Sequence, residues 1–336
     1  MKQGMFLLTA ACVLVLLARG AVEARALEVA AVKPDAADAR EVHQITITFN
    51  QPVVPLGDFE QLAEGLPVTI TPPLPDLPVT VQAGRGVFFP SNYGGSFSGP
   101  RQIRYALANS KNLPALFLAS QLGETRVLDH LQNMGFDSLR RPAGHYGAGI
   151  VLGNGEVTLW NLGQAYSTLA RLGLHKKLTY LARGVESDSR EERRVLDERT
   201  AYMIADALSD AEARAEEFGR GGPLEFAGQV AVRTGTSSDY RDHWTLGFTR
   251  DHTVGVWRGN ADGRPLVARG STWIFHRVME LAGGQAPRWL PRPPGLVTRR
   301  VCSLSGDPVG PHCPGGGMKY SAKRTRRKNS ATCTGR

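Results

Sequence analysis

The stretch Val230-Ala231-Val232-Arg233-Thr234-Gly235-Thr236-Ser237 decides the fold and most of what the chain predicts about function. Its first residues are apolar and β-branched, which is typical of a buried strand. A cation followed by hydroxyl-bearing residues at the end of such a strand is suited to binding a carboxylate through charge-assisted hydrogen bonds. We therefore expect a strand edge that binds an anionic substrate group. An ordinary strand with a bulge glycine is the structural alternative.

Composition bounds the class of protein. The 336 residues have a hydrophobic fraction of 42%, so a packed core is expected, and the length fits about two domains. The formal net charge is +9, and much of the excess lies in a basic tail over residues 316–336, which we interpret as a solvated segment. Its basic residues are Lys319, Lys323, Arg324, Arg326, Arg327 and Lys328. Attraction to an anionic membrane surface or wall polymer is the alternative. We expect no nucleic-acid partner, because only Tyr320 is interleaved with these cations.

The N-terminus is typical of an export signal. Lys2 supplies positive charge, residues 6–17 are apolar, and Ala24-Arg25-Ala26 forms a small-x-small cleavage site. We predict a signal peptide over residues 1–26 and a periplasmic, cell-envelope location. The alternative is an uncleaved anchor in the inner membrane, although a confident span takes about 20 residues.

Two cysteines near the C-terminus are a disulfide candidate. Cys302 and Cys313 enclose a turn rich in Gly and Pro, and an oxidising compartment permits them to pair. They lie in a segment, residues 287–315, that begins with a Pro-rich linker over Pro287 to Pro294. We predict no metal site, because the spacing of Cys302, His312, Cys313 and Cys333 matches no familiar zinc finger.

Residues 27–75 form a piece of β character. The segment from His43 to Asn50 alternates apolar and polar residues, which predicts a half-buried strand, and Pro67 to Pro73 predicts a second short strand. A piece of this size is too small to hold a core of its own, so we interpret it as an incomplete domain.

Residues 76–286 change to helices followed by strands, which predicts an α+β fold. Apolar residues at helical spacing predict helices over 102–109, 113–122, 125–134, 156–172 and 271–281, and Asp197 is suited to cap a further helix that ends at Leu208. Strands are expected over 229–234, 244–248 and 253–257, the last two joined as a hairpin by residues 249–252. Glu216 and Glu217 are expected on a solvated face.

Several motifs follow one another in a specific order. They are Pro90-Ser91-Asn92-Tyr93-Gly94-Gly95, Ala106-Leu107-Ala108-Asn109-Ser110-Lys111-Asn112-Leu113-Pro114-Ala115, Gly155-Glu156-Val157-Thr158-Leu159, the Arg233 strand, Asp242-His243-Trp244 and Thr253-Val254-Gly255-Val256-Trp257-Arg258-Gly259. In this order, residues 76 to about 315 resemble the transpeptidase half and the start of the C-terminal domain of a bifunctional penicillin-binding protein, closest to the 1C type. The resemblance implies a truncated domain of the serine β-lactamase-like fold.

The resemblance also implies roles for particular residues. Ser110 and Asn112 would form the S-x-N element, with Ser110 relaying a proton and Asn112 binding the acyl-donor peptide. Arg233 would supply positive charge, and Thr234 and Thr236 would bind the terminal carboxylate. The backbone after Gly235 would pair with the substrate and contribute an oxyanion donor. The structural alternative for Ser110-Lys111-Asn112 is a helix break in which Ser or Asn is the N-cap.

Two departures from the family pattern predict impaired catalysis. No serine in the chain is followed three places later by lysine, so the S-x-x-K element that supplies the nucleophile and its base is not found. Arg233 also replaces a lysine, and a guanidinium does not reproduce the compact ammonium in a proton network. The implied partners are peptidoglycan stem peptides and, without covalent reaction, β-lactams. No cofactor is expected.

The β piece over residues 27–75 resembles an early domain of bacterial α-2-macroglobulin, a protease trap. Its strands over Gln44 to Asp58 and Val68 to Leu74 carry the likeness, whereas the thioester motif of that family is absent. We hypothesise a fusion of two truncated reading frames near Leu74-Pro75-Asp76. The alternatives to a wall-synthesis protein are therefore a non-catalytic envelope-binding or scaffold protein and a fusion remnant.

Overall fold

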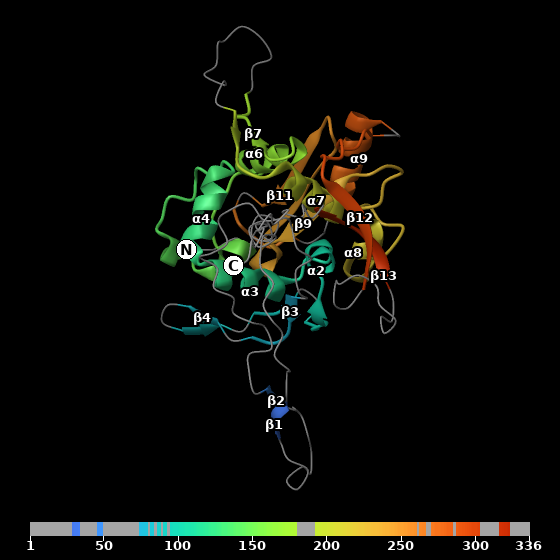
Figure 1. Cartoon of the computed structure of the whole chain (residues 1–336). Helices are drawn as coiled ribbons and strands as arrows, with labels where there is room; N and C mark the ends of the chain where they lie inside the picture. The colour runs from blue at the N-terminus through green and yellow to red at the C-terminus, as the bar shows by residue number, and fades with distance from the viewer. Residues whose placement is uncertain are drawn as a thin grey trace, which may run out of the picture. The chain divides into compact units, whose positions relative to one another are not determined.

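The structure, a computed structural model, describes residues 29–33, 46–49, 74–79, 81–83, 86–88, 90–92, 95–179, 192–260, 262–266, 270–284, 287–302 and 316–322 (Figure 1). The chain separates into two compact units, one of residues Ala18–Thr69 and one of Met1–Leu17 with Ile70–Arg336. The expected signal peptide lies outside the described residues. Within the part that the structure describes, no helix is long and apolar enough to cross a membrane.

The smaller unit contains a pair of short strands. β1 (Val29–Lys33) pairs antiparallel with β2 (Thr46–Phe49), with an irregular register near the start of β1. The strand predicted over His43 to Asn50 is thus confirmed, at shorter length, whereas β1 was not predicted. The strand expected over Pro67 to Pro73 lies outside the described residues.

A three-stranded antiparallel sheet is the centre of the larger unit. Its strands are β9 (Ala231–Thr236), β10 (Asp242–Phe248) and β11 (Thr253–Gly259), in the order β11-β10-β9. The predicted hairpin between β10 and β11 is confirmed, and the Thr249 N–H donates to the His252 carbonyl at 2.9 Å. Alternation along β10 places Trp244, Leu246 and Phe248 on one face, where they join the main core.

Helices cover both faces of this sheet. α6 (Leu159–Ala170) and α7 (Glu198–Ser209) join the main core on the Leu246 face, and α9 (Ser271–Gly283) packs with Val232, Val254 and its own Phe275 on the other. The predicted helices are confirmed with boundaries that differ by a few residues. α6 begins later than expected because Thr158 and Asn161 form a capping box, and Asp197 caps α7 as predicted.

The remaining helices precede the sheet in sequence. They are α2 (Ile103–Ala108), α3 (Asn112–Leu122), α4 (Glu124–Asn133), α5 (Ala143–Tyr146), the 3-10 helix η2 (Ala148–Leu152) and α8 (Ala211–Phe218), with a short η3 (Ser238–Tyr240) after β9. In Figure 1, β9 and β11 lie between α4 on one side and α9 on the other. α8 was not predicted, although Asp210 caps it by accepting from the Ala213 N–H.

Four short strand pairs complete the described residues. β3 (Leu74–Asp76) pairs with β6 (Gly99–Arg101), β4 (Val81–Ala83) with β5 (Gly86–Phe88), β7 (Leu174–His175) with β8 (Arg193–Arg194), and β12 (Leu296–Cys302) with β13 (Gly316–Ala322). The α+β fold class is thereby confirmed.

The C-terminal region differs in part from expectation. The Pro-rich segment is packed onto the body, because Leu290 is buried and Trp289 contacts the core. The first seven residues of the expected basic tail form β13. The other basic residues of that tail lie outside the described part of the chain. Cys302 ends β12, whereas Cys313 lies outside the described residues, so the disulfide stays a prediction.

Candidate functional site

Strand β9 carries the predicted anion-binding residues and has two unlike halves. Ala231 to Arg233 are buried, whereas Thr234, Gly235 and Thr236 are half-buried. Side chains alternate along a strand, so Arg233 lies on the main-core face opposite Leu246, and Thr234 and Thr236 share the other face. The two threonines therefore lie together, on the opposite face of the strand from the arginine.

Arg233 is a buried residue that contacts the end of α2. Its side chain is buried, and Nη1 donates to the Leu107 carbonyl at 2.9 Å, in the last turn of α2. Burial lowers the pKa of Arg233 to about 10, while the nearby Tyr166 and Glu217 oppose the change. The guanidinium is thus still charged at neutral pH, and a cation at a helix C-terminus is favourable because the helix dipole is negative there.

Ser110 lies at the break between α2 and α3, as the sequence predicted. Its backbone has φ of +58°, and its N–H donates to the same Leu107 carbonyl at 3.3 Å. The fold thus brings Ser110 and Arg233 to one carbonyl oxygen. The N-cap of α3 is Lys111, without a side-chain cap bond, so the alternative in which Ser or Asn caps that helix is wrong.

Asn112 is held by a network of polar groups that runs from the surface to the buried Asp76. Its N–H donates to Asn92 Oδ1 at 2.9 Å, and its Nδ2 donates to the Ser91 carbonyl at 2.8 Å. Asn92 Nδ2 in turn donates to Asp76 Oδ1 at 2.6 Å, and the second Asp76 oxygen accepts from the Ser98 N–H at 2.9 Å. Asp76 is fully buried, so this chain of bonds fixes which way Asn92 points and places Asn112 at the start of α3.

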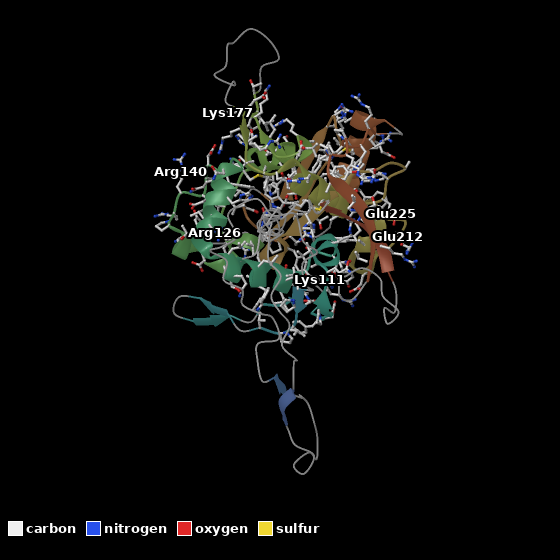
Figure 2. All side chains as sticks on the ribbon, viewed as in Figure 1. Lys111, Arg126, Arg140, Lys177, Glu212 and Glu225 are labelled. Carbon is white, nitrogen blue, oxygen red and sulfur yellow. The ribbon has the colours of Figure 1, made fainter. Side chains whose placement is uncertain are left out.

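Lys111 is a buried cation that the sequence did not single out. Its side chain is 2% exposed, and Nζ lies 3.3 Å from Glu217 Oε2 and 3.5 Å from Glu216 Oε1. In Figure 2 Lys111 is labelled below the centre of the view, whereas Arg140 and Lys177 lie at its outer edge. The expected solvated face is therefore wrong for Glu217, whose side chain is 15% exposed, and correct for the half-exposed Glu216.

Asn109 ties the end of α2 to α8. Its Nδ2 donates to the Ala213 carbonyl at 2.6 Å, and its Oδ1 accepts from the Glu217 N–H at 3.0 Å. Asn109 and Asn92 both lie inside motifs that the resemblance used. The Ala213 partner of Asn109 is 104 positions away, and the Asp76 partner of Asn92 is 16 positions away. No local sequence pattern therefore indicates these contacts.

The far end of β9 is fixed by Asp242. Ser237 Oγ and Asp242 Oδ2 are 2.8 Å apart, and the Asp242 N–H donates back to Ser237 Oγ at 2.8 Å. Trp257 Nε1 donates to the other Asp242 oxygen at 2.9 Å. These bonds hold the three strands in register just beyond Thr236.

The described residues contain no hydrogen bond between a serine hydroxyl and a lysine Nζ. Burial raises the pKa of Tyr105 to about 12 and raises the pKa of Tyr166 further above its usual range, so both phenols are protonated at neutral pH. The site thus combines hydroxyl and amide groups suited to binding a carboxylate.

Comparison with known proteins identifies relatives of this site. The chain is 29% identical over 184 residues to penicillin-binding protein 1C of Escherichia coli, a match that covers 55% of this chain and 23% of that protein. It is 25% identical over 245 residues to penicillin-binding protein 1A of Neisseria cinerea, covering 66% of this chain and 30% of that protein. The chain thus spans about a quarter to a third of these relatives. No protein-family model matches it.

Solved structures show the same fold. Penicillin-binding protein 1A from Haemophilus influenzae superposes with a TM-score of 0.59 at 21% identity, covering 77% of this chain and 46% of that one. The PonA1 protein from Mycobacterium tuberculosis, solved with penicillin V, gives 0.50 at 22% identity, covering 66% and 65%. The larger unit is therefore homologous to the transpeptidase region of penicillin-binding proteins. The likeness of residues 27–75 to α-2-macroglobulin is not among these findings.

Proposed function

We propose that this chain is a periplasmic cell-wall protein that binds peptidoglycan stem peptides reversibly and does not acylate. The relatives are named for penicillin binding, and one structural neighbour is a complex with penicillin V. If Thr234 and Thr236 bind a carboxylate, the chain should bind stem peptides and β-lactams without covalent reaction.

The observation that carries the proposal is the half-exposed run Thr234, Gly235 and Thr236 at a sheet edge. β9 has β10 on one side and no strand on the other among the described residues. An extended peptide added to such an edge gains backbone hydrogen bonds. Its terminal carboxylate would accept from the hydroxyls of Thr234 and Thr236, and Asn112 and Ser110 would line the approach.

We expect no acylation because of the residues that surround Ser110. A serine ester forms when a base removes the proton of an attacking hydroxyl, and the hydroxyl of Ser110 has no lysine or histidine bonded to it in the described part of the chain. Lys111 is paired with Glu216 and Glu217 instead. We therefore expect equilibrium binding without a covalent intermediate.

Two measurements on the purified chain test the proposal. We expect an acyl-D-Ala-D-Ala peptide to bind in isothermal calorimetry and a fluorescent penicillin to leave no label after denaturation. Thr234→Val should weaken peptide binding at least about tenfold, since it removes a hydrogen bond to a charged group. Thr253→Val on the opposite edge strand is the matched control and should not. Covalent labelling of any serine, or absence of peptide binding, would contradict the proposal.

A fusion remnant without function is the competing interpretation. Such a chain would be expected to lack a well-packed site, whereas the Asp76, Asn92 and Asn112 network is complete. A single cooperative thermal transition of the purified chain is expected under our proposal. A broad, non-cooperative melt would favour the remnant.

A further inference from the structure

Strand β11 is the second edge of the central sheet, opposite to β9. It is seven residues long, contains no proline, and pairs with β10 alone among the described strands. A long edge strand of this kind presents unpaired backbone groups and is a template for pairing with another strand.

The hydrogen-bond pattern shows which groups of β11 face outward. Thr249 and His252 form a hydrogen-bonded pair, so bonded pairs in the hairpin alternate from there. The backbone groups of Val254, Val256 and Arg258 then point to β10. Those of Thr253, Gly255, Trp257 and Gly259 point away from the sheet.

Helix α9 packs over β10 and β11, and one side of it carries exposed apolar residues. Its buried residues include Phe275. On one side of Phe275, His276 stacks on Phe226, and its Nδ1 donates to the Pro223 carbonyl at 3.0 Å, in the segment that leads to β9. At 100° per residue, Ile274, Val278 and Leu281 lie on the opposite side of the helix. Since His276 is turned toward the segment that leads to β9, we infer that this opposite side is turned toward β11. The side chains of Ile274, Val278 and Leu281 are 49%, 40% and 71% exposed.

We propose that this edge is a self-association surface, on which the β11 strands of two copies pair antiparallel about a two-fold axis. α9 contacts both β10 and β11, and in this arrangement we take its axis to lie over the space between these two strands. With strands about 4.8 Å apart, the two α9 axes would then lie about 10 Å apart, which is the usual spacing of packed helices. The two apolar flanks would meet above the seam between the copies.

The sequence of β11 is complementary to itself in this arrangement. A two-fold axis at Val256 pairs all seven residues and joins the outward groups of Gly255 and Trp257 as a hydrogen-bonded pair. It places Arg258 opposite Val254 of the other copy, so like charges do not meet. It also places Trp257 opposite Gly255, which leaves room for the indole ring. The surface is separate from the proposed peptide site on β9, so this inference does not depend on the proposed function.

Sedimentation equilibrium of the full chain tests the inference. We expect the wild type to associate to twice its 36.4 kDa mass at micromolar concentration. Val278→Glu should weaken dimerisation at least about 100-fold, because it buries an unpaired charge at the seam. Val278→Lys should do the same, and an equal mixture of the two variants should dimerise again. Trp273→Glu is the matched control, because Trp273 lies on the outer side of α9, and it should leave the dimer intact.

Hydrogen exchange on the wild type gives a readout that no variant can confound. The amide protons of Gly255 and Trp257 should exchange more slowly as concentration rises, whereas those of Val254 and Val256, bonded within the hairpin, should not change. A wild-type chain that sediments as a monomer, or exchange at Gly255 and Trp257 that is independent of concentration, would overturn the inference.

Discussion

The two halves of β9 differ in what surrounds them. In the first half, Arg233 is buried and its guanidinium bonds to the end of α2, so the charge stabilises the packing of helix on sheet. In the second half, Thr234 and Thr236 are half-buried and lie on the opposite face of the strand from Arg233. One short motif thus contains a buried cation that stabilises the fold and two accessible hydroxyls. Mutation of Arg233 should mainly lower stability, whereas mutation of the threonines should mainly lower peptide affinity.

The largest effect should come from Arg233→Leu. The change leaves the Leu107 carbonyl without its charged donor and removes the positive charge near Glu217, so we expect the free energy of unfolding in urea to fall by about 3 kcal/mol. Arg233→Lys should lose less, because it keeps the charge. If the variant is as stable as wild type and loses only peptide binding, the guanidinium contributes to ligand binding. The two halves of β9 would then not differ in function as proposed here.

Asn92→Leu should have the next largest effect, about 2 kcal/mol in urea unfolding. The buried Asp76 carboxylate would lose the closer of its two donors, and the first N–H of α3 would lose its acceptor. Asn260→Leu is the matched control, since Asn260 is exposed and bonds to loop carbonyls, and it should cost less than about 0.5 kcal/mol. Equal losses at the two positions would show that the network does not stabilise the site.

The sequence predicts most helices and strands of the larger unit, because their apolar residues repeat at 3.6 or 2 positions. Through the resemblance it also groups Ser110 and Asn112 with the β9 motif, and the structure brings Ser110 and Arg233 to one carbonyl oxygen. It does not predict the burial of Lys111 or the partners of Asn92, since these depend on contacts between segments far apart in the chain. Nor does it reveal that Arg233 and Thr234 have separate environments, which depends on what packs on each face of the sheet.

Thr236→Val tests the open half of β9 alone. Thr236 is half-buried, so the isosteric change should alter the free energy of unfolding by less than about 1 kcal/mol. Peptide affinity should fall about tenfold, because a hydrogen bond to a carboxylate is lost. A large loss of stability with unchanged affinity would reverse the assignment of the two halves.

The smallest effect should come from Asp197→Asn, which changes the N-cap of α7, the helix that packs on β9. α7 packs on β9, and Asp197 caps it by accepting from the N–H groups of Arg199 and Thr200. Partial burial opposes ionisation, yet the Arg199 guanidinium and these N–H groups hold the pKa of Asp197 below its ordinary value of 3.8. Asparagine keeps the cap and removes the charge, so we expect a loss below about 1 kcal/mol at pH 7.

That loss should depend on pH with a definite sign. Since the folded pKa lies below the unfolded one, the unfolded chain binds more protons in the window between them, and the stabilisation by Asp197 is present above pH 3.8 and lost as pH falls through the folded pKa. The stability difference between wild type and Asp197→Asn should therefore close in acid, while peptide affinity at pH 7 stays unchanged in the variant. A difference that persists at low pH would mean that the amide, and not the missing charge, perturbs α7. A loss of peptide affinity at pH 7 would instead mean that the N-cap of α7 and the Thr234 and Thr236 face of β9 are energetically coupled.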